Sequence, residues 1–154
     1  MKILNVAAVA LAALLLGSAY AHEHKAPHKG TLIEFGEEFA HLELVLKDGR
    51  LTGYVLDGEA EKAVRVKQKE IEIKIDKIEG KEKSVTVTLK AVANVLTGET
   101  EGDTSEFHAT SDDLKKVKKF EASVSAMSVK GKEFKDVKFK FPEGNEEGKD
   151  EKKK

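Results

Sequence analysis

The 154-residue sequence contains no cysteine and no tryptophan, and only two tyrosines and two prolines. The absence of cysteine excludes disulfide bonds, thiolate metal ligands and thiol nucleophiles. The scarcity of tryptophan and tyrosine disfavours broad, flat aromatic binding platforms. Acidic and basic residues nearly balance, at 28 against 27, so the chain lacks the positive excess that nucleic-acid-binding proteins carry. We therefore expect no nucleic-acid partner.

Sequence signatures of catalysis are also missing. The chain has no G-x-S-x-G nucleophile elbow and no glycine-rich loop of the kind that cradles phosphate before a helix. Carboxylates are so abundant that any pair could be named as an acid and base, which gives such a pairing no weight. We predict that the protein is not an enzyme.

The amino-terminal segment has the pattern of a secretory signal. Lys2 supplies a positive start, residues 3–16 are almost entirely apolar, and Ala19-Tyr20-Ala21 matches the small-x-small cleavage motif. The apolar run is shorter than the roughly 20 residues that a membrane-spanning helix needs. We predict that residues 1–21 form a cleaved signal peptide, which places the mature chain in the periplasm or outside the cell without a membrane span.

Beyond residue 30 the apolar residues recur every second position, which is typical of strands. Alternating runs cover residues 40–46, 51–55, 71–75, 85–93, 120–126 and 137–141. The Asp48-Gly49 and Asp57-Gly58 pairs are hairpin signals, because glycine tolerates a positive φ. We predict an all-β domain, an antiparallel two-sheet β-sandwich of the immunoglobulin-like type with seven or eight strands.

The segments outside these strands divide the rest of the chain. Residues 111–117 have the pattern of a helical turn between strands, with a serine before two acids. Residues 94–105 have the composition of a long loop. We expect a flexible, histidine-containing arm at 22–29, the sandwich domain at 30–142, and a charged, disordered tail at 143–154 that contains no apolar residue.

Three of the five histidines lie in the arm. After cleavage at Ala21 the mature chain begins His22-Glu23-His24, and a free amine with histidine in third place can wrap a metal in a square plane of four nitrogens. Such a plane suits Cu(II) or Ni(II). His22 could compete as a ligand, and His28 could complete a brace. The candidate metal residues are therefore His22, Glu23, His24, His28 and His41. A polar leader with no metal role remains an alternative.

The other histidines fall on predicted strands. His41 alternates with the leucines of residues 42–46, so we expect its side chain to point outward into solvent. His108 alternates with Phe107, and we expect it to be exposed as well. Either could join a metal site only if the fold brings it near the arm. Met127 is isolated in sequence and is expected to pack in the core.

The motifs "PHKG", "HLELVL", "YVLDG", "GDTSEF" and "FKDVKFKFPEG" occur in this order over residues 27–144. In this order and spacing the chain resembles the small exported domain at the amino end of heavy-metal efflux adaptors of the cobalt–zinc–cadmium type. The resemblance implies a β-sandwich associated with metal resistance, with His28 and His41 at positions where the pattern has histidines. No helical hairpin, lipoyl-like or barrel segment follows in the sequence, so we expect the domain to stand alone.

Together these features predict an exported, non-catalytic metal-binding protein that takes Cu(II) or Ni(II), with an envelope protein or an efflux component as a possible partner. The alternative is an envelope interaction module without a metal role, which would recruit its partner through exposed strand edges.

Overall fold

The computed structural model describes residues 24–146, so the predicted signal peptide and the residues His22 and Glu23 lie outside the described part. Within these residues eight strands follow one another. They are β1 (Thr31–Phe35), β2 (Ala40–Lys47), β3 (Arg50–Leu56), β4 (Glu70–Ile78), β5 (Val85–Ala91), β6 (Glu106–Thr110), β7 (Phe120–Val129) and β8 (Lys132–Phe141). The prediction of an all-β chain with alternating strands is confirmed.

All eight strands belong to one antiparallel sheet, in the order β1-β2-β3-β6-β5-β4-β7-β8. The prediction of two separate sheets in an immunoglobulin-like sandwich is therefore wrong. The sequence signal is the same for both arrangements, because strands of a sandwich and of a rolled sheet both bury one face. The difference lies in pairings between distant strands, such as β4 with β7 and β3 with β6.

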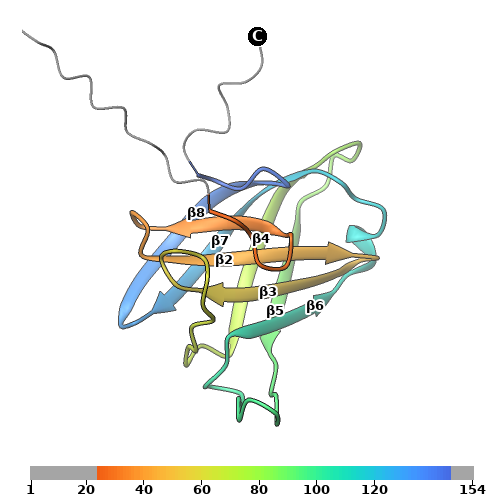
Figure 1. Cartoon of the computed structure of the whole chain (residues 1–154). Coiled ribbons are helices and arrows are strands. Elements are labelled where there is room, and N and C mark those ends of the chain that lie inside the picture. The colour runs from red at the N-terminus through yellow and green to blue at the C-terminus, as the bar shows by residue number, and fades with distance from the viewer. Residues whose placement is uncertain (1–23, 147–154) are drawn as a thin grey trace, which may run out of the picture.

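The sheet rolls into a barrel-like form that brings its first and last strands together (Figure 1). The Thr31 hydroxyl of β1 donates to the Pro142 carbonyl just after β8, at 3.0 Å. The Asn145 side chain then pairs with the backbone of Glu34 in both directions. The Glu34 N–H donates to Asn145 Oδ1 at 2.7 Å, and Asn145 Nδ2 donates to the Glu34 carbonyl at 3.0 Å. A side-chain amide thus takes the place of a strand partner at this seam.

Gly144 allows the chain after β8 to lie directly against β1. Its φ is +86°, and a Cβ at this position would stand 2.3 Å from the Leu32 carbonyl oxygen. Any other residue would both strain the backbone and push the two segments apart. The glycine is therefore required by the close approach at the seam.

The inside of the rolled sheet is the hydrophobic core, and every strand contributes to it. One fully or nearly fully buried residue from each strand, in chain order, is Ile33, Leu42, Val55, Ile73, Val87, Phe107, Val124 and Phe139. Met127 is also buried there, as expected. Burial of this kind contributes about 1.5–3 kcal/mol for each large aliphatic or aromatic side chain.

The outer face of β2 is covered as well. Residues 24–30 fold back over it, and a second small apolar cluster of Leu32, Leu56 and Ala60 packs against Ala26 there. His41 and Glu43 point to this outer face, yet both side chains are completely buried. The expectation that His41 is solvated is wrong, because alternation along a strand cannot show that another segment covers its outer face.

These contacts move both predicted domain boundaries. Residues 24–29 of the predicted flexible arm include a turn closed by Lys29 N–H donating to the Ala26 carbonyl. Residues 143–146 of the predicted disordered tail include Gly144 and Asn145 at the seam. The domain therefore extends at least over residues 24–146. The sequence did not indicate that these two segments are ordered, because both are polar and lack strand or helix periodicity.

The predicted helical turn is present as a 3-10 helix, η1 (Asp112–Leu114), which joins β6 to β7 and buries Leu114. Within residues 24–146, no helix is long and apolar enough to cross a membrane.

The seam gives a first testable prediction. Asn145→Ala should lower the free energy of unfolding by about 1–3 kcal/mol, because it removes two hydrogen bonds and leaves backbone groups of Glu34 unpaired. Urea denaturation measures the change. Asn145→Asp keeps the acceptor for the Glu34 N–H but loses the donor, so its loss should be smaller. An alanine variant as stable as the wild type would contradict the role of this amide.

Candidate metal centre

The candidate site is built around His41, the second residue of β2. One nitrogen of its ring is hydrogen-bonded to the backbone. His41 Nδ1 lies 3.1 Å from the Asp57 carbonyl oxygen, in the segment after β3. A carbonyl oxygen only accepts, so Nδ1 of a neutral His41 is the donor and Nε2 presents its lone pair. Histidines that ligate metals are oriented in this way by a hydrogen bond to the other nitrogen.

His24 and Glu146 bring the remaining donor atoms. The His24 and His41 rings meet edge to face, with centroids 4.8 Å apart. Glu146 Oε1 lies 3.3 Å from His24 Nδ1 and 3.5 Å from His41 Nε2. The side chains of His24 and Glu146 are only 7% and 9% exposed, and that of His41 is not exposed. Two imidazoles and a carboxylate thus converge in a largely water-free place.

One ligand atom from each of these three residues lies within 4.8 Å of the others, which is close enough for one ion to contact all three. The Nε2 atoms of both histidines are buried and, among the described residues, have no hydrogen-bond partner. Buried polar atoms are normally satisfied, since an unpaired one costs about 1–3 kcal/mol. A proton on His24 would give an ion pair with Glu146, but it would not supply His41 Nε2 with a hydrogen-bond partner. An ion held between the three residues would bind one nitrogen of each ring.

The three residues come from separate parts of the chain. His24 precedes β1, His41 lies on β2 and Glu146 follows β8, so the cluster exists only when the sheet has closed. Of the residues predicted from the sequence, the structure brings together His24 and His41. It adds Glu146, which the sequence analysis missed because it is one acid among many in a charged segment. His22 and Glu23 lie outside the described residues.

His28, also predicted as a ligand, is engaged elsewhere on the outer face of the sheet. Its ring stacks on Tyr54 of β3, with centroids 3.7 Å apart and planes within 9°. Its Nδ1 lies 2.8 Å from Glu43 Oε2. Burial, followed by the negative charges of Glu106 and Glu43, raises the pKa of Tyr54, so the phenol stays protonated. His28 is not part of the His24, His41 and Glu146 cluster.

Glu43 is the reason for this arrangement. Its fully buried carboxylate accepts the backbone N–H groups of His28 and Gly30, both at 2.8 Å, as well as contacting the His28 ring. Hydrogen bonds to a carboxylate are among the stronger ones in proteins. Glu43 therefore anchors the segment that carries His24 across the sheet, two positions from His41 on the same face of β2.

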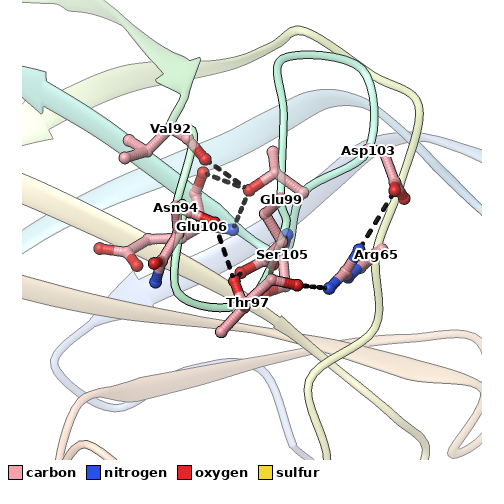
Figure 2. A network of polar contacts seen from close by, with 9 residues as sticks. Arg65, Val92, Asn94, Thr97, Glu99, Asp103, Ser105 and Glu106 are labelled. Carbon is pink, nitrogen blue, oxygen red and sulfur yellow. Dashed lines mark hydrogen bonds and ion pairs between the residues drawn. The ribbon is translucent and has the colours of Figure 1, made fainter.

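A second buried carboxylate, that of Glu99, lies in the loop between β5 and β6 (Figure 2). Glu99 accepts the N–H and the hydroxyl of Ser105, at 2.9 and 2.6 Å, and the hydroxyl of Thr97. Arg65 donates to the Thr97 carbonyl and to Asp103. No histidine belongs to this described network, and the Ser105 hydroxyl is tied to a carboxylate, so the network serves to shape the loop.

The Glu99 network predicts a specific pH dependence. Burial acts to raise the pKa of Glu99, but the hydrogen bonds from Ser105 and Thr97 outweigh it and lower the pKa. The stabilisation is therefore present above the usual carboxyl range and is lost as the pH falls through the lowered pKa. Glu99→Gln should lower the free energy of unfolding by about 1–3 kcal/mol at neutral pH and should remove this part of its pH dependence. Urea unfolding between pH 7 and pH 3 measures both effects. The matched control is Glu101→Gln, exposed on the same loop, and an equal effect of both changes would contradict the assignment.

No protein-family model, curated protein or solved structure matches this chain. The resemblance to efflux adaptors therefore stays a prediction, and the functional argument depends on the geometry of the described residues.

Proposed function

We propose that the protein is an exported, non-catalytic metal-binding protein and that its folded site consists of His24, His41 and Glu146. The observation that carries the proposal is the pair of buried imidazole Nε2 atoms that lack a hydrogen-bond partner beside a shared carboxylate oxygen. The orientation of His41 by the Asp57 carbonyl supports it, since it leaves the ligating nitrogen free of its proton.

The donor chemistry favours a divalent transition metal over calcium or magnesium. Imidazole nitrogens suit zinc, copper and nickel, whereas calcium and magnesium prefer sites made of oxygen alone. Copper(II) and nickel(II) remain the preferred candidates, because cleavage after Ala21 would place a free amine two residues before His24. That nitrogen could extend the two-imidazole set. Export and a link to heavy-metal efflux are part of the same proposal, supported by the leader pattern and the motif order of the sequence.

Two modes of binding are distinguishable. A chelate made only by the cleaved terminus uses its amine, its own amides and His24, and it does not need His41. A folded site uses His24, His41 and Glu146 together and closes only with the sheet. The structure favours the second mode, because His24 is packed against His41 rather than extended from the surface.

The test is titration of the mature protein with Cu(II) and Ni(II), followed by calorimetry and visible spectra. His41→Ala and Glu146→Gln should each weaken binding by about 100-fold or more, because each removes one of three ligands. At 100 times its dissociation constant, the metal should stabilise the wild-type fold by about 2.7 kcal/mol. Intact mass of the secreted chain establishes its first residue.

The matched control is His108→Ala, which removes a histidine of β6 that contacts Arg50 and Glu106 and lies outside the cluster. It should leave metal affinity unchanged. If His41→Ala destabilises the fold, the milder Glu146→Gln still tests the site. Affinity that survives both ligand changes but disappears on acetylating the terminal amine would overturn the folded site in favour of the terminal chelate.

An interaction module of the envelope is the second candidate function, and one observation favours it. Val95 and Leu96, in the loop shaped by Glu99, are 94% and 93% exposed. The Leu96 N–H is already bonded to the Asn94 side chain, so the tip is pre-formed for burial against another protein. The outer edges of the sheet, which the sequence analysis named as a docking surface, are less suited. At the seam the edge strand β1 is hydrogen-bonded to the segment after β8.

If the protein is an interaction module, a partner protein should be recovered with it even when a chelator removes metal ions. The double change Val95→Ser with Leu96→Ser should abolish this recovery, because it removes the apolar surface of the tip while leaving the Glu99 network intact. Pull-down with the wild type, the double variant and Glu146→Gln measures it. A partner lost on chelation or with Glu146→Gln, but kept by the double variant, would contradict docking through the tip.

A further inference from the structure

The sheet splits between β5 and β6, and an open hollow lies at the split. The two strands pair only at Lys90 with His108 and at Ala91 with Phe107. Beyond these pairs β5 continues to Val85 and β6 to Thr110 without meeting, and the two strands run at different angles in Figure 1. The hollow has a volume of about 510 Å³, which is in the range of sites for small molecules.

Apart from Val87 and Ala109, the residues that line the hollow carry donor or cationic side chains, and none is acidic. They include the guanidinium of Arg50 from β3, the ammonium of Lys90 from β5 and the His108 ring from β6. Hydroxyl groups complete the polar lining and come from Thr86, Thr88, Thr110 and Ser111. In a chain with more acidic than basic residues, a concave surface without any carboxylate is a distinct electrostatic feature.

A hydrogen-bond relay holds Arg50 in position. Its Nη2 donates to His108 Nδ1 at 2.6 Å, so Nδ1 accepts and the N–H of Nε2 donates to Glu106 Oε1 at 2.5 Å. The Glu106 carboxylate is thereby engaged by the His108 ring, and Glu106 is not itself a lining residue. The relay orients the guanidinium while leaving its other N–H groups for a ligand.

Nearby carboxylates are engaged with other lysines. Asp112 pairs with Lys115 at 2.6 Å, and Asp113 pairs with Lys83 at 2.7 Å. Glu70 stands opposite Lys90 in the β4–β5 register, but no ion pair joins them in the described structure. The positive charge of Lys90 therefore remains unneutralised at the hollow.

The strand edges add further donors, which alternate with carbonyl acceptors. Where β5 and β6 separate, the sides that face each other have no strand partner, so their backbone N–H groups are not used in the sheet. Arginine, lysine, hydroxyl and backbone N–H donors together match the many acceptor oxygens of a phosphate or sulfate group.

We propose that this hollow binds a phosphate- or sulfate-type anion, carried by a small polar molecule of the size of a monosaccharide. Arg50 and Lys90 contact the anionic oxygens, and the hydroxyl groups contact the remainder. The site is separate from the metal cluster in residues and in chemistry, and the proposal does not depend on metal binding.

The experiment is an NMR titration of the ¹⁵N-labelled mature protein in chelator, at constant ionic strength. The probes are inorganic phosphate, sulfate and glucose 6-phosphate, with glucose and chloride as neutral and simple-anion controls. We expect saturable shifts centred on residues 86–90 and 108–111 with the first three probes, tightest with glucose 6-phosphate. Equal affinity for phosphate and glucose 6-phosphate would assign the site to the free anion, which keeps the anion site but overturns the carrier molecule.

Variants decide whether the contacts are specific. Arg50→Gln and Lys90→Gln should each weaken binding about 10-fold or more, as loss of a charged hydrogen bond does. The Lys90 side chain forms no hydrogen bond or ion pair in the described structure, and its backbone pairs in the sheet do not depend on that side chain, so Lys90→Gln should keep the fold. The control Lys138→Gln changes an exposed lysine of β8 and should leave affinity unchanged. Shifts that do not saturate, or an equal loss with all three changes, would overturn the site.

Discussion

The buried carboxylate of Glu43 is the interaction on which the arrangement of the candidate site depends. By accepting the N–H groups of His28 and Gly30, it holds the chain before β1 against the outer face of β2. That cover turns His41 from a surface residue into a buried one and brings His24 beside it. A carboxylate taken out of water is costly unless it is hydrogen-bonded, and each oxygen of Glu43 has a partner within 2.8 Å. The same contacts that stabilise Glu43 therefore also create a dry setting for two imidazoles.

The seam between β1 and β8 has a related role at the other end of the chain. Gly144 permits the close approach, and Asn145 pairs with Glu34 as a strand would. Glu146 follows at once, so its position is set by the closure of the sheet. An ion bound by His24, His41 and Glu146 would connect the segments that precede the first strand and follow the last one. In the proposed function, metal affinity and the stability of the closed sheet are thus two measures of one equilibrium.

The sequence predicted much of the fold and part of the site, for identifiable physical reasons. Alternation along strands such as Ile71–Ile75 is a local consequence of burying one face, so the strands and their core residues could be predicted. The single sheet could not, because the pairing of β4 with β7 is a contact between distant segments. His24 was found by its position near the terminus, but the burial of His41 depends on the covering segment. Glu146 has no local signal that separates it from the acids around it.

The described part of the chain begins at His24 and ends at Glu146, and both residues belong to one cluster, which has a practical consequence for handling the protein. If the chain is cleaved after Ala21 as proposed, a histidine-rich affinity tag at the new amino end would be attached two residues before His24, and a tag after Lys154 would be attached eight residues after Glu146. Such a tag would add imidazoles at high local concentration and would compete for the same ions. Recombinant material for spectroscopy is therefore best produced with a removable or internal handle, so that coordination reflects the native side chains alone.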